Sequence, residues 1–518
     1  MIRRSFHSAV VAASLFALLP VSHALAQEKV LRVAVQATDI GTLDPHRTSS
    51  THEKTPISWM FGGLVRFKPG TADPGKIEGD LAESWTESKD GLVWTFKLRK
   101  GVQFHRNYGE ATADDVVYSI SRASDPKRSS FSSTFVSFEK VEAVDPYTVR
   151  ITLKNAVPSL LGLVSNYHGG MIVSRTADKE LGDGFKLNPV GFGPFEFVEH
   201  QTQREVILKA HDKYYLGKPK IARIFLKFIN SDSSRDLAFT SGELDLIYGK
   251  REQKWVERMR LAKGAKVDIF GPGEFRTVYL NQKIKPLDDQ RVREAVARSV
   301  DTSQLIRFVG PDVGNPGKSV VPPGYLGESD AGPKFPPDVA KAKKLLAEAG
   351  FPQGLTLKAV VSNNTSQLPI MEVIQSQLKR SGITLNMEVV DHTTYHAQIR
   401  KDVSALVFYG AARFPVADQW LTEFYHSASE IGSPTQVTNF SHCRVGDAEI
   451  KSARDDPDPA KRLALWKTAQ QKIAADICGI PLFDLMQVWA RTEKLDYGFA
   501  LTGSLNLAPP ISEKSTLK

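Results

Sequence analysis

A hairpin of two strands followed by a helix is encoded between Gly79 and Ser119, and it constrains the fold of this 518-residue chain more than any other stretch. Apolar and polar residues alternate from Val93 to Leu98, as expected for a strand with one buried face, and the turn pair Asp90-Gly91 precedes them. Thr112-Ala113-Asp114-Asp115 is typical of a helix start, because its hydroxyl and carboxylates can accept hydrogen bonds from unpaired backbone amides. The segment therefore predicts a β-hairpin that leads into a helix.

This segment closely resembles the one shared by the family 5 extracellular solute-binding proteins, the oligopeptide-, dipeptide- and nickel-binding components of ABC importers. The matching residues are LAESW, then DG, then TFKLRKGVQFH and TADDVVYS, and the turn Arg106–Gly109 departs from the usual pattern. Further matches follow in the family's order along most of the chain: Leu43–His46, Asn188–Phe195, Tyr214–Gly217, Gly242–Asp245, Asp289–Ala295 and the helix Ala340–Gly350.

The resemblance implies an α/β fold, namely the two-lobe periplasmic binding protein fold of type II, cluster C, with an extra subdomain inserted in the first lobe. We expect lobe I at residues 27–272 with the subdomain at about 51–184, lobe II at 273–486, and a C-terminal return to lobe I at 487–518. Crossovers between the lobes are expected near Phe270–Arg276 and Phe483–Trp489. Helices and strands alternate after about residue 340, which by itself predicts a parallel sheet.

The N-terminal residues 1–26 are typical of a cleavable signal peptide. Arg3 and Arg4 precede a short apolar run, and Ala24-Leu25-Ala26 provides a small-residue cleavage site. The arginine pair partly matches a twin-arginine signal, so the sequence leaves the export route open. No cysteine lies near the cleavage site, so we expect a freely diffusing periplasmic protein and not a lipoprotein.

Composition limits the classes of function. The formal charge is +9, but lysines and arginines are dispersed and not gathered into a stripe, which does not favour nucleic-acid binding. The chain has two cysteines, Cys443 and Cys478, and an exported protein is expected to join them as a disulfide, with two buried thiols as the alternative.

Motifs for catalysis or metal binding are weak. No G-x-S-x-G, H-E-x-x-H or C-x-x-C pattern occurs, so we expect no enzyme activity, no cofactor and no metal. Gly314–Ser319 ends like a phosphate-binding loop but lacks its first glycine. His392 and His396 are spaced like zinc ligands on one helix face, but without a third ligand a solvated face is the simpler interpretation.

Specificity is expected to lie in the loop around Ala405–Asp418. In the family, the resemblance implies, an aspartate here holds the α-ammonium group of a peptide ligand. A gapless count back from Trp420-Leu421 puts Arg413 at that position, and a guanidinium suits a carboxylate or phosphate. The alternative is that Asp418 keeps the ammonium role. Tyr409 and Ala411 are further candidates in this loop.

Other candidate substrate-binding residues are less specific. The resemblance places Thr38, Asp39 and Ile40 in a loop that borders the ligand. Asp484 is an acidic residue in an otherwise apolar stretch near the second expected crossover. It either faces the cleft or caps a turn.

Together these features imply a non-catalytic periplasmic receptor that captures a peptide-like or anionic small solute, such as an opine, a sugar phosphate or a modified peptide. Its expected partners are an inner-membrane ABC permease and its ATPase subunits, with no nucleic acid, and the receptor is expected to be a monomer. The alternatives are a secreted α/β hydrolase acting on a similar solute and a sensor or chaperone on the same scaffold.

Overall fold

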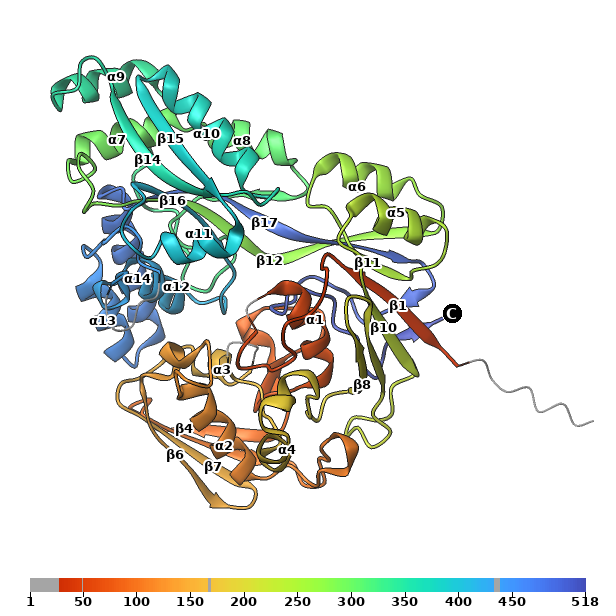
Figure 1. Ribbon diagram of the computed structural model, residues 1–518. Helices are drawn as coiled ribbons and strands as arrows, with labels where there is room; N and C mark the ends of the chain where they lie inside the picture. The colour runs from red at the N-terminus through yellow and green to blue at the C-terminus, as the bar shows by residue number, and fades with distance from the viewer. Residues whose placement is uncertain (1–27, 49, 166–168, 433–437) are drawn as a thin grey trace, which may run out of the picture.

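The chain folds into two lobes of mixed helices and strands (Figure 1). This computed structural model describes residues 28–48, 50–165, 169–432 and 438–518. The predicted signal peptide, residues 1–26, lies outside the described residues. Within the described part of the chain, no helix is both long enough and apolar enough to span a membrane.

A nine-stranded sheet is the largest sheet of the described chain. Its strands follow the order β16-β12-β17-β11-β1-β10-β9-β8, with β13 beside β17. Its strands are β1 (Val30–Val35), β8 (Phe195–Gln201), β9 (Glu205–Ala210), β10 (Arg223–Phe228), β11 (Leu246–Tyr248), β12 (Ala265–Leu280), β13 (Gly314–Pro316), β16 (Leu406–Ala411) and β17 (Gly479–Thr492). At one end of this sheet, strands β11, β1, β10, β9 and β8 belong to the first lobe. At the other end, β16 and β13 belong to the second lobe (Figure 1).

Two long strands, β12 and β17, lie side by side and run through both lobes (Figure 1). Their antiparallel register extends from Ala265 opposite Thr492 to Tyr279 opposite Gly479, and it is interrupted between Phe270 and Glu274. The interruption coincides with Gly271-Pro272-Gly273, where proline removes a backbone donor and glycine weakens the strand. The limits 27–272, 273–486 and 487–518 for the lobes remain predictions.

The prediction of a parallel sheet is correct only in part. β1 pairs in parallel with β10 and β11, and β14 (Leu355–Ser362) pairs in parallel with β15 (Ile383–Val390), but β12 pairs antiparallel with both β16 and β17. The physical reason is the path of the chain. It enters the second lobe along β12 and returns along β17, so these two neighbours must run in opposite directions.

The predicted hairpin and helix are present in the inserted part of the first lobe. β4 (Ala82–Glu87) and β5 (Val93–Leu98) pair antiparallel, and β5 buries Trp94, Phe96 and Leu98 on one face. Helix α2 (Ala113–Ser124) starts with a capping box in which Thr112 and Asp115 exchange hydrogen bonds. With β6 (Phe138–Asp145) and β7 (Thr148–Leu153) the hairpin completes a four-stranded sheet in the order β4-β5-β7-β6.

The remaining elements cover the sheets. In the first lobe they are α1 (Thr51–Met60), β2 (Val65–Phe67), β3 (Ile77–Gly79), α3 (Leu160–Leu163), α4 (Arg175–Leu181), α5 (Asp232–Thr240), α6 (Gln253–Arg260), β18 (Leu495–Asp496) and β19 (Thr516–Leu517). In the second lobe they are α7 (Gln290–Ser299), α8 (Thr302–Val309), α9 (Val339–Glu348), α10 (Leu368–Arg380), α11 (His392–Gln398), α12 (Ala417–Tyr425), α13 (Asp447–Asp455) and α14 (Pro459–Ala475).

Two clusters of buried apolar side chains hold the lobes together. One is centred on α7, α10, β14 and β15 of the second lobe and extends to Phe239 and Trp255 on α5 and α6 of the first. The other fills the first lobe and continues into the second through Tyr279, Phe414 and Trp420. The second lobe also carries a disulfide bond between Cys443 and Cys478. Because both apolar clusters include residues of both lobes, the structure represents the lobes in contact with each other.

Candidate functional site: a charged cluster between the lobes

Three neighbouring strands bring together residues from distant parts of the chain. Phe275 on β12 lies opposite Ala411 on β16 and opposite Asp484 on β17. The predicted residues Ala411 and Asp484 therefore share one row of the sheet, with Arg413 just beyond the end of β16. This row lies where β12 resumes its pairing after the interruption at Gly271–Gly273.

Two arginines and one glutamate form the centre of the site. The guanidinium of Arg276 donates to Glu274, and Arg251 lies 3.2 Å from the same carboxylate. Desolvation by burial acts to raise the pKa of Glu274, but the charges of Arg251 and Arg276 outweigh it and lower that pKa to about 2. Glu274 is therefore ionised at neutral pH and holds both arginines in place.

Asp484 lies beside this group in a different protonation state. One of its oxygens accepts a hydrogen bond of 3.1 Å from the backbone amide of Gly273. Its Oδ1 is buried and has no hydrogen-bond partner among the described residues. Burial raises the pKa of Asp484 to about 7, with Glu274 adding to the effect. This carboxyl group is thus able to donate or accept a proton near neutral pH.

Lys54 reaches the same site from α1 in the first lobe. Its side chain is buried, and burial together with the charge of Arg413 lowers the pKa of Lys54 to about 7, against the opposing influence of Glu274. The electrostatic interactions with Arg413 and Glu274 place this lysine between the lobes. Cationic groups from both lobes therefore converge on one buried region.

Arg413 is mostly buried and is held from several sides. Its Nε donates to Glu423 on α12, its Nη1 donates to the carbonyl of Ala412 at 2.9 Å, and its guanidinium lies 5.5 Å from the ring centroid of Phe424. The hydroxyl of Tyr325 donates to the Arg413 carbonyl and accepts from the Arg413 amide. The loop after β16 is therefore fixed in orientation before any solute arrives.

Aromatic rings line the second lobe next to this arginine. The half-buried ring of Tyr409 lies 5.0 Å from Phe440 and 6.2 Å from Phe424, and Phe424 also packs 4.3 Å from Trp420. Trp420 Nε1 is buried and has no hydrogen-bond partner among the described residues. Aromatic surfaces of this kind provide apolar walls in ligand sites.

The loop after β16 also forms a direct contact between the lobes. The ring of Phe414 lies 5.7 Å from that of Phe67 in the first lobe. It also covers Gly162 on α3 so closely that a Cβ atom at Gly162 would lie 2.2 Å from Cγ of Phe414. Glycine at position 162 is therefore required for this approach of the two lobes.

Other predicted residues lie apart from the charged cluster. Thr38 is exposed, Ile40 is buried in the core, and Asp39 accepts a hydrogen bond from the Ile40 amide and lies 2.7 Å from His200 on the same lobe. Asp418 is buried in the first turn of α12 and lies 3.3 Å from the Nε of Arg454. The structure thus brings Tyr409, Ala411, Arg413 and Asp484 together, but ties Asp39 and Asp418 to partners elsewhere.

Four charged residues of the cluster were missed by the sequence analysis: Lys54, Arg251, Glu274 and Arg276. The signal for two of them is visible in the sequence. Glu274 and Arg276 are charged residues two apart, directly after the breaker cluster Gly271-Pro272-Gly273 and before the largely apolar run Thr277–Leu280. Lys54 and Arg251 carry no comparable local signal, because only the tertiary fold brings them to the site.

The interpretation of His392 and His396 as a solvated helix face is wrong. Both rings are half-buried, their Nε2 atoms are 3.2 Å apart, and His396 packs against Tyr409 with the ring centroids 5.8 Å apart. Burial lowers the pKa of His396 to about 4 and lowers that of His392 as well. The helix α11 turns these rings inward because its buried residue Tyr395 fixes its orientation against β16.

One group of three potential metal ligands is found in the described part of the chain, formed by Cys443, Asp476 and Cys478. Its two sulfur atoms are bonded to each other, so only the carboxylate remains as an anionic ligand.

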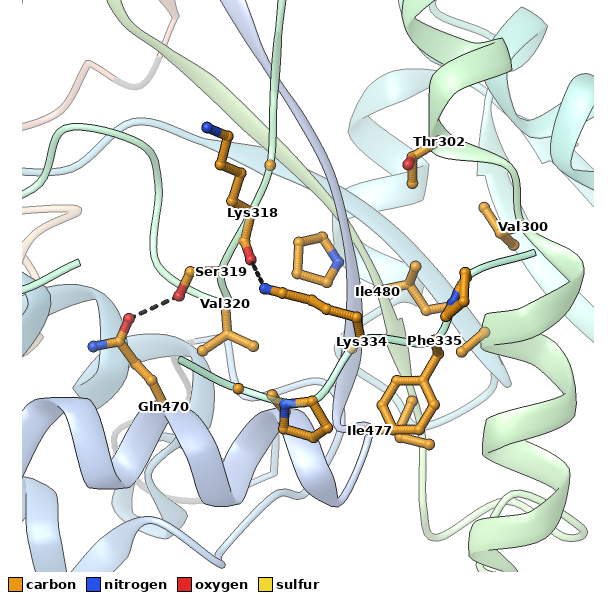
Figure 2. Close-up of a pocket in the computed structure, with 18 of the residues that line it drawn as sticks. Val300, Thr302, Lys318, Ser319, Val320, Lys334, Phe335, Gln470, Ile477 and Ile480 are labelled. Atoms are coloured by element: carbon orange, nitrogen blue, oxygen red, sulfur yellow. Dashed lines mark hydrogen bonds between the residues drawn. The ribbon is translucent and has the colours of Figure 1, made fainter. Parts of the chain in front are cut away.

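A separate cavity of about 300 Å³ lies within the second lobe (Figure 2). Lys334 extends along it and donates to the carbonyl of Lys318, while Ser319 donates to Gln470 at 2.8 Å. Phe335 is among its apolar lining residues. None of the predicted site residues lines this cavity. The stretch Gly314–Pro316 just before it forms strand β13 and not a phosphate-binding loop.

Comparisons with known proteins agree with this architecture. The sequence profile described as bacterial extracellular solute-binding proteins, family 5 middle, matches residues 76–431. The solved structure of MoaA from A. tumefaciens R10, in complex with mannopinic acid, is 47% identical, with a TM-score of 0.87 over 95% of this chain and 100% of that chain.

Two more distant relatives bind other solutes. DppA from Helicobacter pylori, solved with the peptide STSA, is 27% identical, with a TM-score of 0.82 over 94% of this chain and 98% of that one. The glutathione-binding protein GsiB of Escherichia coli is 28% identical over 96% of both chains. The chain belongs to the family 5 bacterial extracellular solute-binding proteins, the substrate-binding components of ABC importers.

Proposed function

We propose that this receptor captures an anionic solute of the opine class, an amino acid conjugated through its nitrogen, between its two lobes. The observation that carries the proposal is the gathering of cationic groups in one buried region: Arg251 and Arg276 flank Glu274, and Lys54 of the first lobe has its pKa lowered by the charge of Arg413 of the second. Two like charges in a buried region repel each other, and a carboxylate placed between them relieves that repulsion. A solute with a carboxylate would therefore favour the closed state by contacting both lobes at once.

Other features of the site support an anionic solute. Arg251 and Arg276 add two guanidinium groups, and the protonated form of Asp484 is favoured by its raised pKa. The complex of MoaA with mannopinic acid comes from a protein of 47% identity, whereas the peptide- and glutathione-binding relatives are below 30%. Among the candidates Arg413 and Asp418, we favour Arg413 as the anchor, because its charge acts on Lys54 within the site, whereas Asp418 is buried in the first turn of α12 against Arg454.

Membership of the family supports the steps before and after solute capture. Release would be to an inner-membrane permease with its ATPase subunits, after export to the periplasm by the N-terminal leader. The solute would leave chemically unchanged, and the comparisons give no support to a hydrolase. We also propose that the receptor acts as a monomer.

Replacing Arg413 with lysine should weaken binding of mannopinic acid by about tenfold, because lysine keeps the charge but loses the planar fork that matches a carboxylate. Calorimetric titration of the purified mature protein measures this. Arg444→Lys is the matched control, since Arg444 makes the same kind of pair with Glu430 but is largely exposed in the segment before α13.

Equal affinities of wild type and Arg413→Lys for mannopinic acid would remove Arg413 from the site. Failure of wild type to bind any opine would overturn the proposed class of solute. Native mass spectrometry of protein purified without denaturation would then identify the retained solute by its mass.

A further inference from the structure

The histidine pair on α11 is an unassigned group of potential ligands beside the charged cluster. His392 and His396 occupy one face of the helix four residues apart, and their ring centroids are 4.5 Å apart. Helix α11 lies on the side of the second lobe that faces α1 of the first (Figure 1). Tyr409, against which His396 packs, belongs to the same wall as Arg413.

The separation of the two Nε2 atoms matches that of two ligands on one metal ion. Imidazole nitrogens bind first-row metals at about 2.0 to 2.1 Å, so two neighbouring ligands at angles of about 90° to 110° lie about 2.9 to 3.4 Å apart. The observed separation of 3.2 Å falls in this range.

A second residue orients His392 for this role. Its Nδ1 lies 2.9 Å from the hydroxyl oxygen of Ser362, the buried last residue of β14. That oxygen also accepts a hydrogen bond from the amide of Asn364. When Nδ1–H donates to Ser362, the lone pair of His392 is on Nε2 and points toward His396. Such an outer hydrogen bond is the usual means of fixing the tautomer of a metal-binding histidine.

The rings are also held in place on their other sides. The ring of His392 stacks on Tyr395 with an interplanar angle of 10°, and the Tyr395 hydroxyl donates to the carbonyl of Phe408 on β16. The ring of His396 meets the same tyrosine edge-on, with the ring centroids 5.3 Å apart. Tyr395 therefore contacts both imidazoles.

We propose that His392 and His396 form a two-imidazole binding site for a late first-row divalent cation, on the wall of the second lobe next to Tyr409. Imidazole favours Cu²⁺, Ni²⁺ and Zn²⁺, and Cu²⁺ binds most tightly in this series. Water fills the remaining positions on the ion. Arg276 and Arg400 are cationic neighbours that weaken the site, so we expect micromolar and not nanomolar affinity. The inference does not depend on the organic solute.

Cu²⁺ binding to the untagged mature protein, freed of metal with a chelator that is then removed, tests the site. Titration with copper chloride should give one bound ion per chain, with nitrogen splitting in the electron paramagnetic resonance spectrum. His392→Gln and His396→Gln should each weaken binding by about tenfold or more. His200→Gln is the matched control, since His200 is a half-buried histidine of the first lobe paired with Asp39.

Three results would overturn the site: no stoichiometric Cu²⁺ in wild type, unchanged affinity in His392→Gln/His396→Gln, or an equal loss in His200→Gln. Circular-dichroism melting of each variant separates loss of the ligands from loss of the fold. A variant that melts like wild type and fails to bind Cu²⁺ supports the proposal. If His396→Gln does not fold, Cu²⁺ binding is measured with His396→Asn instead.

Discussion

Replacing Gly162 with alanine should weaken solute binding by roughly 5- to 150-fold, which corresponds to the cost of about 1 to 3 kcal/mol for overfilling a packed site. The added Cβ would lie 2.2 Å from Cγ of Phe414, so the ring of Phe414 and the Gly162 backbone cannot both keep their places. The ring is 3% exposed and has little room to move. Because Gly162 and Phe414 belong to different lobes, the strain falls on the closed state.

The same change should not harm the ligand-free protein. Gly162 lies in α3, where alanine is a better helix former than glycine. We therefore expect the melting temperature without ligand to stay the same or to rise slightly, while the affinity measured by calorimetry falls. In a Phe414→Ala background, Gly162→Ala should have little effect on affinity, because the ring that the new Cβ atom would meet is absent. Equal affinities of Gly162→Ala and wild type would mean that closure does not bring these residues together.

Local sequence signals predicted the elements of the fold well. The hairpin of β4 and β5 and the start of α2 follow from turn and capping chemistry within a few residues of each other, so no distant contact is needed to specify them. The family resemblance predicted the two-lobe architecture. The direction of the strands in the large sheet could not be predicted from local sequence, because β12 and β17 pair across about 200 residues of sequence.

Sequence reasoning named candidate residues only where a local pattern marked them, as in the loop after β16 and at Asp484 in its apolar stretch. Tyr409, Ala411 and Arg413 lie in one segment of the chain, and the structure keeps them together. Lys54 and Arg251 come from separate elements, and their role depends on the lobes meeting. The two histidines were judged by spacing alone, and their burial against Tyr395 and Tyr409 is a property of the tertiary packing.

Replacing Glu274 with glutamine should lower the free energy of unfolding by about 3 to 5 kcal/mol at pH 7, because it leaves Arg251 and Arg276 buried without their shared counter-charge. The pH dependence follows from the pKa of Glu274, which is about 2 in the folded protein and near 4.5 when unfolded. A lowered folded pKa gives stability that is present above pH 4.5 and is lost as the pH falls toward 2. Denaturant unfolding at pH 7 and pH 4 should therefore show a smaller difference between variant and wild type at the lower pH.

Replacing Asp484 in the same cluster with asparagine should raise the free energy of unfolding, whereas Glu274→Gln lowers it. The pKa of Asp484 is raised from 3.8 to about 7 on folding, so its contribution to stability is complete below pH 3.8 and is lost as the pH rises through 7. At pH 8 the ionised, buried carboxylate of wild type is unfavourable, and asparagine should stabilise the protein by about 1 to 3 kcal/mol while still accepting from the Gly273 amide. At pH 5 the advantage of asparagine should be smaller than at pH 8, because Asp484 of the folded wild type is then protonated. At pH 8, Glu274→Gln should therefore destabilise the protein and Asp484→Asn should stabilise it. If both variants changed the stability in the same direction, the charges assigned to Glu274 and Asp484 would be wrong, because burial alone predicts the same sign for both.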